Sequence, residues 1–398
     1  MKYKIKEHIL VLALVYLGFF IDSINAVLIK VLGENNSLSL VNRILTEAVF
    51  VTLLLKNRIY RPIKYLIFFF SIAIIGMLFT VVLQITNIPE LLQNIVIVNK
   101  VLYFFIVVSI IYYYFDNQRE ILFKFFEIVY FIFIISILFG FIFQIPFLES
   151  YPQEKRFGYK GLIVTQNEAV GIFLIGLFYF SAKYEQLRNN MSIVYIIFIL
   201  IGGLLTGSKA NMFFLTLSTV LIYIYYVFKS KKMAKTVILF IPILFMIDWN
   251  RIFDIFSTTI NYITSFYNKG MDIWSILLSG RNWRVQDMMQ EIANEPYFWY
   301  NYLFGGFNFS RMGTEMDMFD IWQLFGFIGT SAFYIIYIST IINYSKKSIL
   351  VYLFLIVWLI ASSLGGHLIY NAVIPIYLSI MLLRFTQVHE SKICLQEK

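Results

Sequence analysis

The sequence is poor in charged residues and in the residues that build disulfides and metal sites. Only 14% of its 398 residues are Asp, Glu, Lys or Arg, against about 25% in a soluble domain. The single cysteine, Cys394, excludes an internal disulfide. The three histidines, His8, His367 and His389, are too far apart to match a metal-binding spacing. These shortages argue against a disulfide-stapled fold and against a metal cluster.

Apolar residues are abundant instead. Hydrophobic residues make up 60% of the chain, aromatic residues make up 19%, and the mean hydropathy is +0.77. Apolar runs of about 20 residues recur along the length, and each is long enough to cross a hydrocarbon layer of about 30 Å. The sequence therefore predicts an all-α, polytopic membrane protein. The net charge of +9 fits loop lysines and arginines that set topology, and we expect no nucleic-acid partner.

The apolar runs predict about twelve transmembrane helices. The run from Ile9 to Ile29 is interpreted as the first of them, because it is too long for the apolar region of a signal peptide and no small-x-small cleavage site follows. The predicted spans are 9–29, 38–55, 63–84, 92–114, 121–144, 161–182, 191–206, 210–228, 234–249, 318–342, 347–364 and 367–383.

The distribution of lysine and arginine predicts that both termini are cytoplasmic. With that orientation, 20 of these residues lie on the inner side and five lie in short outer loops. The chain 1–398 is then one membrane domain, with one large extracytoplasmic loop, 250–317, before the last three spans. A loop this long in a compact domain usually has a function.

Ionisable residues inside membrane spans are energetically costly and are candidates for function. Here they are Asp22, Arg43, Glu47, Lys100, Glu127 and Glu168. All except Glu127 fall in the outer half of their spans, which suggests a polar cavity open to the outside. Structural alternatives stay open: Arg43 can pair with Glu47, four residues away on the same helix face, and Lys100 can pair with Asp22 or Glu168.

The segment LLSGRNWRVQDMMQEIA at 277–293 predicts a short amphipathic helix in the large loop. Ser279 is the predicted N-cap, since its hydroxyl can accept from an unpaired backbone N–H group. The apolar face is formed by residues at helical spacing, Val285, Met288, Met289 and Ile292.

Two arginines open this predicted helix. Arg281 and Arg284 are three residues apart and share a side. Together with the free N–H groups of a helix N-terminus, their guanidinium groups suit an anion such as a phosphate. The alternative is that Arg284 pairs with Asp287 or Glu291 on a solvated face.

Three carboxylates, Glu315, Asp317 and Asp320, stand where the large loop returns to the membrane. Carboxylates at a low-dielectric border can have raised pKa values and act as general bases. Alternatively they are acids in the first turn of a solvated helix. His367, in LGGHLIY, lies at a predicted outer turn, where a lone histidine is more often structural.

Five motifs follow one another along residues 150–330. They are RFGYKGLIVTQNEAVG, LLTGSKANMFFL, SGRNWRVQDM, LFGGF and EMDMFDIWQLFGFIGT. In this order the chain resembles the O-antigen ligase and polymerase family of membrane glycosyltransferases, especially polymerases of capsular or exopolysaccharide repeat units. Lys209 stands where the family's TGSR-like turn has arginine. Glu315 stands where ligases often carry a histidine–asparagine pair, which argues against a ligase that uses that histidine.

The resemblance implies a reaction in the outer leaflet of the bacterial cytoplasmic membrane. A glycan on a polyprenyl diphosphate is the donor, and the terminal hydroxyl of a second lipid-linked repeat unit is the acceptor. No nucleotide sugar, metal or other cofactor is implied. The implied partners are the lipid-linked oligosaccharides and the bilayer, with a flippase and a chain-length regulator of the same pathway as candidates.

The resemblance also implies roles for particular residues. Four cations are expected at the diphosphate: Arg156, Lys209 and Arg281, with Arg284 behind them. Glu315 or Asp317 is the expected base, followed by Asp320, with His367 in reserve. Aromatic side chains of the loop would stack on sugars or anchor at the interface; they are Trp283, Tyr297, Trp299 and Tyr300.

Other functions remain open. A ligase that transfers finished glycan to a final acceptor would share the fold and the arginines. A flippase or transporter for the same glycan predicts related halves and short loops on both sides, and the sequence shows neither. A structural or regulatory membrane protein would leave the arginines and carboxylates of the loop unexplained.

Overall fold

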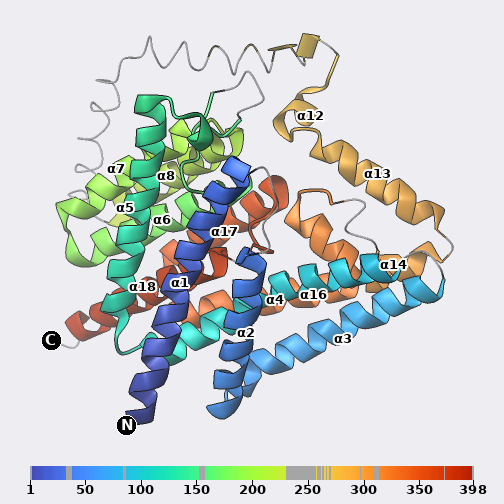
Figure 1. The fold of residues 1–398 in the computed structure, drawn as a ribbon. Coiled ribbons are helices and arrows are strands. Elements are labelled where there is room, and N and C mark those ends of the chain that lie inside the picture. The colour runs from blue at the N-terminus through green and yellow to red at the C-terminus, as the bar shows by residue number, and fades with distance from the viewer. Residues whose placement is uncertain are drawn as a thin grey trace.

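The protein is an all-α bundle, as the sequence predicts (Figure 1). The computed structural model describes residues 2–32, 38–83, 87–151, 157–229, 270–295, 297–307, 313–371 and 373–396, with scattered positions between 257 and 268. No β-strand occurs among these residues. The helices are α1 (Lys2–Leu32), α2 (Leu38–Lys56), α3 (Tyr60–Val82), α4 (Ile88–Phe115), α5 (Arg119–Phe143), η1 (Pro146–Leu148), α6 (Gln166–Leu187), α7 (Asn190–Leu205), α8 (Lys209–Lys229), α12 (Ile273–Leu277), α13 (Arg281–Asn294), α14 (Phe298–Phe304), α16 (Asp317–Ser345), α17 (Ile349–Gly365) and α18 (Ile374–Gln396).

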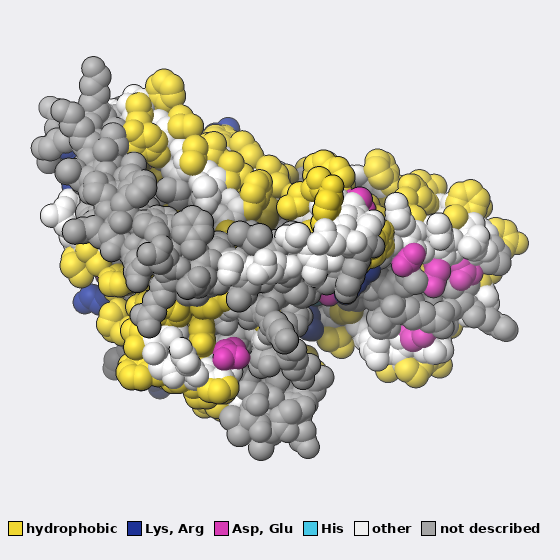
Figure 2. Space-filling model, turned by 90° about the horizontal axis from the view of Figure 1, so that it is seen from above, with side chains coloured by type: hydrophobic (Ala, Val, Ile, Leu, Met, Phe, Trp, Pro, Cys, Tyr) yellow, Lys and Arg dark blue, Asp and Glu magenta, His cyan; other side chains and the backbone are white. Residues whose placement is uncertain are grey.

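Seven of the described helices are long and apolar enough to cross a membrane: α1 to α5, α8 and α16. Helices α7 and α17 are apolar but shorter, and α6 and α18 are less apolar and lie mostly inside the bundle. Figure 2 shows hydrophobic side chains exposed along the rim of the molecule as seen from above. Large apolar side chains are exposed on α1 to α5, α8 and α16, and lipid contact accounts for such exposure. The predicted span 234–249 lies outside the described residues.

Two predicted spans begin later than expected. Helix α6 begins at Gln166 rather than at 161, and α18 begins at Ile374 rather than at 367. The described residues that precede each helix form loops. Their apolar side chains are buried without being helical, and periodicity does not distinguish a buried loop from the end of a span.

The bundle has two ends. We call the end at the lower left of Figure 1, where α1 starts and α18 finishes, the terminal end. We call the opposite end, where α12 and α13 lie, the cavity end. Helix α13 bridges there between α12 and α14, outside the main bundle.

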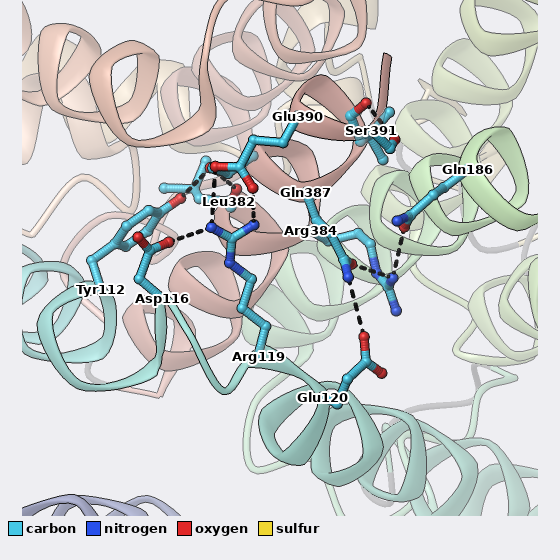
Figure 3. Close-up of polar contacts among 12 residues, drawn as sticks. Tyr112, Asp116, Arg119, Glu120, Gln186, Leu382, Arg384, Gln387, Glu390 and Ser391 are labelled. Carbon is cyan, nitrogen blue, oxygen red and sulfur yellow. Dashed lines mark hydrogen bonds and ion pairs between the residues drawn. The ribbon is translucent and has the colours of Figure 1, made fainter. Parts of the chain in front are cut away.

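Two arginines at the terminal end, Arg119 and Arg384, are held by partners on other elements (Figure 3). The Arg119 guanidinium binds Glu390 on α18 at 2.7 Å and Asp116 at 2.5 Å. Arg384 on α18, only 2% exposed, donates to Gln186 on α6 at 3.0 Å. These contacts fix α18 against the start of α5 and the end of α6.

Helix α14 packs against a break in α16. Gly326 has φ 64° and ψ −176° inside α16, and a Cβ there would lie 2.3 Å from the carbonyl of Leu303. A Cβ at Gly305 would lie 2.4 Å from the nitrogen of Gly326. Both positions therefore need glycine, and the LFGGF motif holds the returning loop against the bundle.

Helix α13 packs on the bundle through its apolar side. Met288 and Ile292 are buried in a small cluster with Phe307 and Trp322. The predicted N-cap is wrong: the cap position is Gly280, in the left-handed region at φ 77°, and no side chain caps the helix. Ser279 is itself left-handed at φ 57°, because the chain reverses direction between α12 and α13.

Candidate functional site

The motif that precedes α6 packs against the turn between α7 and α8. The Tyr159 N–H group donates to the carbonyl of Leu205 at 2.8 Å. The Thr206 carbonyl accepts from Gln166 Nε2, at the start of α6, at 2.9 Å. The motifs RFGYKGLIVTQNEAVG and LLTGSKANMFFL thus meet at the cavity end although about 40 residues separate them.

Lys209 connects this turn to the large loop. Its ammonium group donates to the carbonyl of Ile276 in α12 at 2.5 Å. Lys209 therefore helps to position α12, and α13 follows directly. It does not line the cavity described next. Arg156, the other cation expected in this region, lies outside the described residues.

A cavity of about 470 Å³ opens beside the start of α13. Its lining contains three cations, Arg43 from α2, Lys100 from α4 and Arg281 from α13, together with Glu315 and His367. Three of these five, Arg281, Glu315 and His367, are sequence-derived site candidates. The structure brings them together with two ionisable residues of the spans.

Glu315 lies between the two arginines of α13. Its Oε1 accepts from Arg284 Nη1 at 2.5 Å, and its Oε2 accepts from Arg281 Nη2 at 3.2 Å. Arg284 is therefore paired across the loop, and the expected alternative of Asp287 or Glu291 is wrong. Arg281 Nη2 also donates to Asn167 at 3.3 Å.

The two arginines decide the protonation state of Glu315. Burial raises its pKa, but the hydrogen bond from Arg284 and the charges of Arg281 and Arg284 outweigh burial, so the pKa lies below its ordinary value. Glu315 is therefore ionised at neutral pH and is a weak proton acceptor. This favours a role in holding the arginines rather than the role of base.

His367 lies in a tight turn against the backbone of Glu315. The turn is left-handed at Gly366 and at His367, with φ of 63° and 61°. A Cβ at Gly366 would lie 1.9 Å from the Glu315 carbonyl oxygen, so only glycine allows this approach. The His367 ring meets Tyr370 edge to face, with centroids 4.8 Å apart.

The surroundings keep His367 neutral. Burial lowers the pKa of His367 to about 4, the positive charges of Arg281, Lys100 and Arg284 act in the same direction, and Glu315 opposes them. At neutral pH the imidazole therefore carries a free lone pair inside the cavity. Of the four sequence-derived base candidates, His367 is the one that lines the cavity unprotonated and outside an ion pair. With a pKa of about 4 it is as weak a proton acceptor as Glu315, so a role as base requires a bound anion that raises this pKa.

Asp317 and Asp320 are fully buried and do not line the cavity. Asp317 Oδ2 accepts from two successive backbone N–H groups just after His367, at 2.9 and 2.8 Å. Asp320 accepts from the N–H and hydroxyl groups of Thr314, both at 2.8 Å, and from the Tyr370 hydroxyl at 3.0 Å. Both carboxylates therefore fix the two loops that carry Glu315 and His367.

The expected pairing of Arg43 with Glu47 does not occur. Arg43 pairs with Asp22 on α1 at 3.4 Å, and Glu47 accepts from Asn99 on α4 at 2.6 Å. Contacts between helices replace the contact along one helix, because both side chains face neighbouring helices rather than each other.

Lys100 has no carboxylate within 4.0 Å among the residues that the structure describes, so neither expected partner pairs with it. Asp22 binds Arg43, and Glu168 accepts from Asn371 at 2.7 Å while it closes a capping box with Thr165. The Lys100 ammonium is thus left facing the cavity.

The large-loop aromatics lie away from the cavity lining. Trp283, Tyr297 and Trp299 are 40%, 56% and 52% exposed. Tyr300 instead stacks on Phe79 of α3 at 3.7 Å. The polar lining includes Asn167 and Asn371, which the sequence reasoning did not select. The glutamine–asparagine pair at the start of α6 was the available signal for the first.

The charges facing the cavity do not balance. Three cations line it, against the single lining carboxylate of Glu315, and His367 is neutral. Asp22, outside the lining, pairs with Arg43, so the excess amounts to one cation, Lys100. No group of three or more potential metal ligands lies together in the described part of the chain. The arrangement suits an anion with more than one negative charge and leaves a lone pair available to accept a proton beside it.

Comparison of the sequence with protein-family models, with curated proteins and with solved structures gives no match. The assignment of function therefore rests on the motifs and on the geometry of this cavity.

Proposed function

We propose that the protein is a polysaccharide polymerase, which joins polyprenyl-diphosphate-linked oligosaccharide repeat units at the outer face of the cytoplasmic membrane. Its product would be an O-antigen, a capsule or an exopolysaccharide. The observation that carries the proposal is the cavity in which Arg43, Lys100 and Arg281 outnumber Glu315 beside a neutral His367.

The cations would bind the diphosphate of the donor. Arginine forks match phosphate oxygens in a bidentate way, and a lysine adds a point charge. During the reaction the bond between the anomeric carbon and the diphosphate oxygen breaks, and the leaving group keeps the electron pair. Arg281, Arg43 and Lys100 would stabilise the negative charge that develops there, which is usually the largest contribution to such catalysis.

His367 would accept the proton of the attacking hydroxyl. The new bond joins that hydroxyl oxygen to the anomeric carbon, and the proton moves to the imidazole. A bound diphosphate would offset the surrounding cations and raise the pKa of His367 above its value of about 4. The base would therefore strengthen when the donor is in place.

The arrangement of the ends supports the proposed topology. The start of α1 and the end of α18 lie at one end of the bundle, and the cavity lies near α12 and α13 at the other. With both termini cytoplasmic, as the lysine and arginine bias predicts, the cavity faces outward. About twelve spans with one large outer loop remain our proposal for the whole chain.

A ligase is the second candidate, and one observation favours it. A neutral histidine faces the cavity, although Glu315 stands where ligases of the family often carry theirs. A ligase would use the same diphosphate site and the same proton acceptor with a different final acceptor.

Surface glycan from cells that carry Arg281→Ala tests the proposal and separates the candidates. We expect long polymer to disappear and single lipid-linked repeat units to accumulate outside. If long polymer persists on its lipid carrier but does not reach its final anchor, the protein is a ligase. If polymer length and attachment are both normal in Arg281→Ala, the cavity is not the diphosphate site and the proposal is wrong. Lys347→Ala, an exposed cation at the terminal end, is the matched control at equal expression.

A further inference from the structure

A second cavity, of about 260 Å³, lies among α3, α4 and α16 near the terminal end. The proposed reaction makes no use of it. Its polar lining consists of Arg61, Tyr65, Ser109, Thr340, Asn343 and Tyr344. A polar cavity on the membrane-facing part of a bundle calls for a polar occupant, because hydrocarbon would leave these groups without partners.

The cavity lies at the depth of lipid headgroups. Ser109 is six residues from the end of α4, and Thr340 is five residues from the end of α16. At about 1.5 Å per residue these positions lie roughly 8 to 9 Å inside the helix ends. Arg61 is the second residue of α3. The cavity therefore extends from the interface to the first part of the hydrocarbon layer.

Arg61 is oriented within its own helix. Its Nε donates to the Tyr65 hydroxyl at 2.7 Å, and the guanidinium lies 5.8 Å from the centre of that ring. Its two terminal nitrogens have no hydrogen-bond partner among the described residues. They are free to bind two oxygens of one phosphate, the geometry that a guanidinium fork favours.

Further cations surround this cavity. Arg58, Lys64, Lys346 and Lys347 are exposed in the loops and helix turns beside Arg61 and Tyr344. None of them forms an ion pair with a carboxylate in the described part of the chain. Basic pockets between membrane helices on the cytoplasmic side are suited to anionic lipid headgroups.

We infer that this second cavity binds the phosphate headgroup of an anionic phospholipid in the leaflet at the terminal end. Arg61 would bind the phosphate, while Asn343 and the Tyr344 hydroxyl would bind the polar atoms next to it. The acyl chains would lie along the exposed apolar surface of α3, where Ile67 and Phe68 are 62% and 46% exposed. The lipid would fasten α3 to α16.

Thermal unfolding of the full-length protein in a neutral detergent tests this inference. We expect micelles with phosphatidylglycerol to raise the unfolding midpoint by several degrees in a saturable way. Phosphatidylcholine should have little effect. Equal protection by phosphatidylcholine would overturn the inference, and so would no protection by phosphatidylglycerol. Glycerol 3-phosphate without acyl chains separates the sources, because full protection by it would assign the cavity to a soluble phosphate instead.

Variants place the effect at this cavity. Arg61→Gln should abolish the shift, and Arg58→Gln, an exposed arginine outside the lining, should keep most of it. If Arg61→Gln does not fold, Asn343→Leu provides the test, because Asn343 is exposed and its amide faces the same site. A full shift with Asn343→Leu and equal losses for Arg61→Gln and Arg58→Gln would point to diffuse surface charge and overturn the inference.

Discussion

The two ends of the bundle both hold charged side chains between helices, but the pairing of these charges differs. At the terminal end, Lys183 and Arg384 share Glu127 at 2.6 and 3.8 Å, and Arg119 has two carboxylate partners. The Arg384 guanidinium also lies 3.9 Å from the centre of the Phe123 ring. At that end, three cations meet three carboxylates across helix contacts.

The cavity end leaves one lining cation, Lys100, without a carboxylate partner among the described residues, while Arg43 pairs with Asp22 and Arg281 with Glu315. Arg43, Lys100 and Arg281 face one cavity in which Glu315 is the only carboxylate of the lining. Charges taken out of water are costly unless they are paired, so the terminal-end network is what a stable bundle needs. An excess of cations is instead what an anionic ligand needs. The comparison separates charges that hold helices together from charges that, in the proposed function, would bind the diphosphate of the donor.

The largest effect is expected from His367→Ala. Loss of a proton acceptor should lower polymer formation from lipid-linked repeat units in proteoliposomes by about 10²- to 10⁴-fold. The thermal unfolding midpoint should change little. Glu315→Gln keeps the size of the side chain and should retain more activity, because Glu315 is held by two arginines. The reverse order of the two variants would make Glu315 the base.

Arg384→Met and Lys100→Met compare the two ends directly. Arg384→Met removes buried hydrogen bonds to Gln186 and Tyr179, while Glu127 keeps Lys183, and should lower the free energy of unfolding by about 1 to 3 kcal/mol. Lys100→Met removes a cation with no described carboxylate partner and should leave stability equal or higher. It should weaken diphosphate binding about tenfold, or about 1.4 kcal/mol.

Both quantities are measurable on purified protein, by unfolding in mixed micelles and by titration with a soluble polyprenyl diphosphate analogue. A large loss of stability in Lys100→Met with unchanged binding would place Lys100 among the structural charges. Arg384→Met should bind the analogue normally in its folded fraction.

A further expected effect is the pH dependence of stability that His367 causes. Its pKa is about 4 in the folded protein and about 6.5 in an unfolded chain. Between these values the unfolded chain binds a proton that the folded protein does not, so stability falls as the pH falls through this window. The full shift corresponds to about 3 kcal/mol, of which about 2 kcal/mol should be lost between pH 6.5 and pH 4.5.

Unfolding at pH 6.5 and pH 4.5 measures this loss. His367→Asn should remove most of it, while His389→Asn, at the half-buried histidine of the terminal end, should not. An unchanged pH dependence in His367→Asn would mean that the ring is already accessible to protons, and the cavity would not keep it neutral.

Much of the fold and part of the site could be predicted because the signals are local. Hydrophobic run length identifies the helices, and the spacing of Met288 and Ile292 gives the face of α13 that packs on Phe307 and Trp322. Arg281, Glu315 and His367 were selected as ionisable residues in or beside predicted outer loops. The chemistry of these side chains made them candidates for the site before the structure showed where they lie.

The rest of the site depends on contacts that no local pattern encodes. Arg43 meets Asp22 from 21 residues away, and Glu47 meets Asn99 from 52 residues away. Asp317 and Asp320 lie in the first turn of α16, and Glu315 lies two residues before it. In the sequence alone these three carboxylates cannot be told apart. Only the packed loops decide that the two aspartates are buried and bonded while Glu315 faces the cavity.

The sequence by itself determined that this chain is an all-helical protein rich in membrane-length helices, because apolar runs and their period are properties of neighbouring residues. It also determined which side chains have the chemistry to bind a diphosphate. The tertiary structure alone decided which of them share a cavity. It decided as well that His367 is neutral and Glu315 is ionised, because a pKa depends on the charges and the burial that distant segments bring to it.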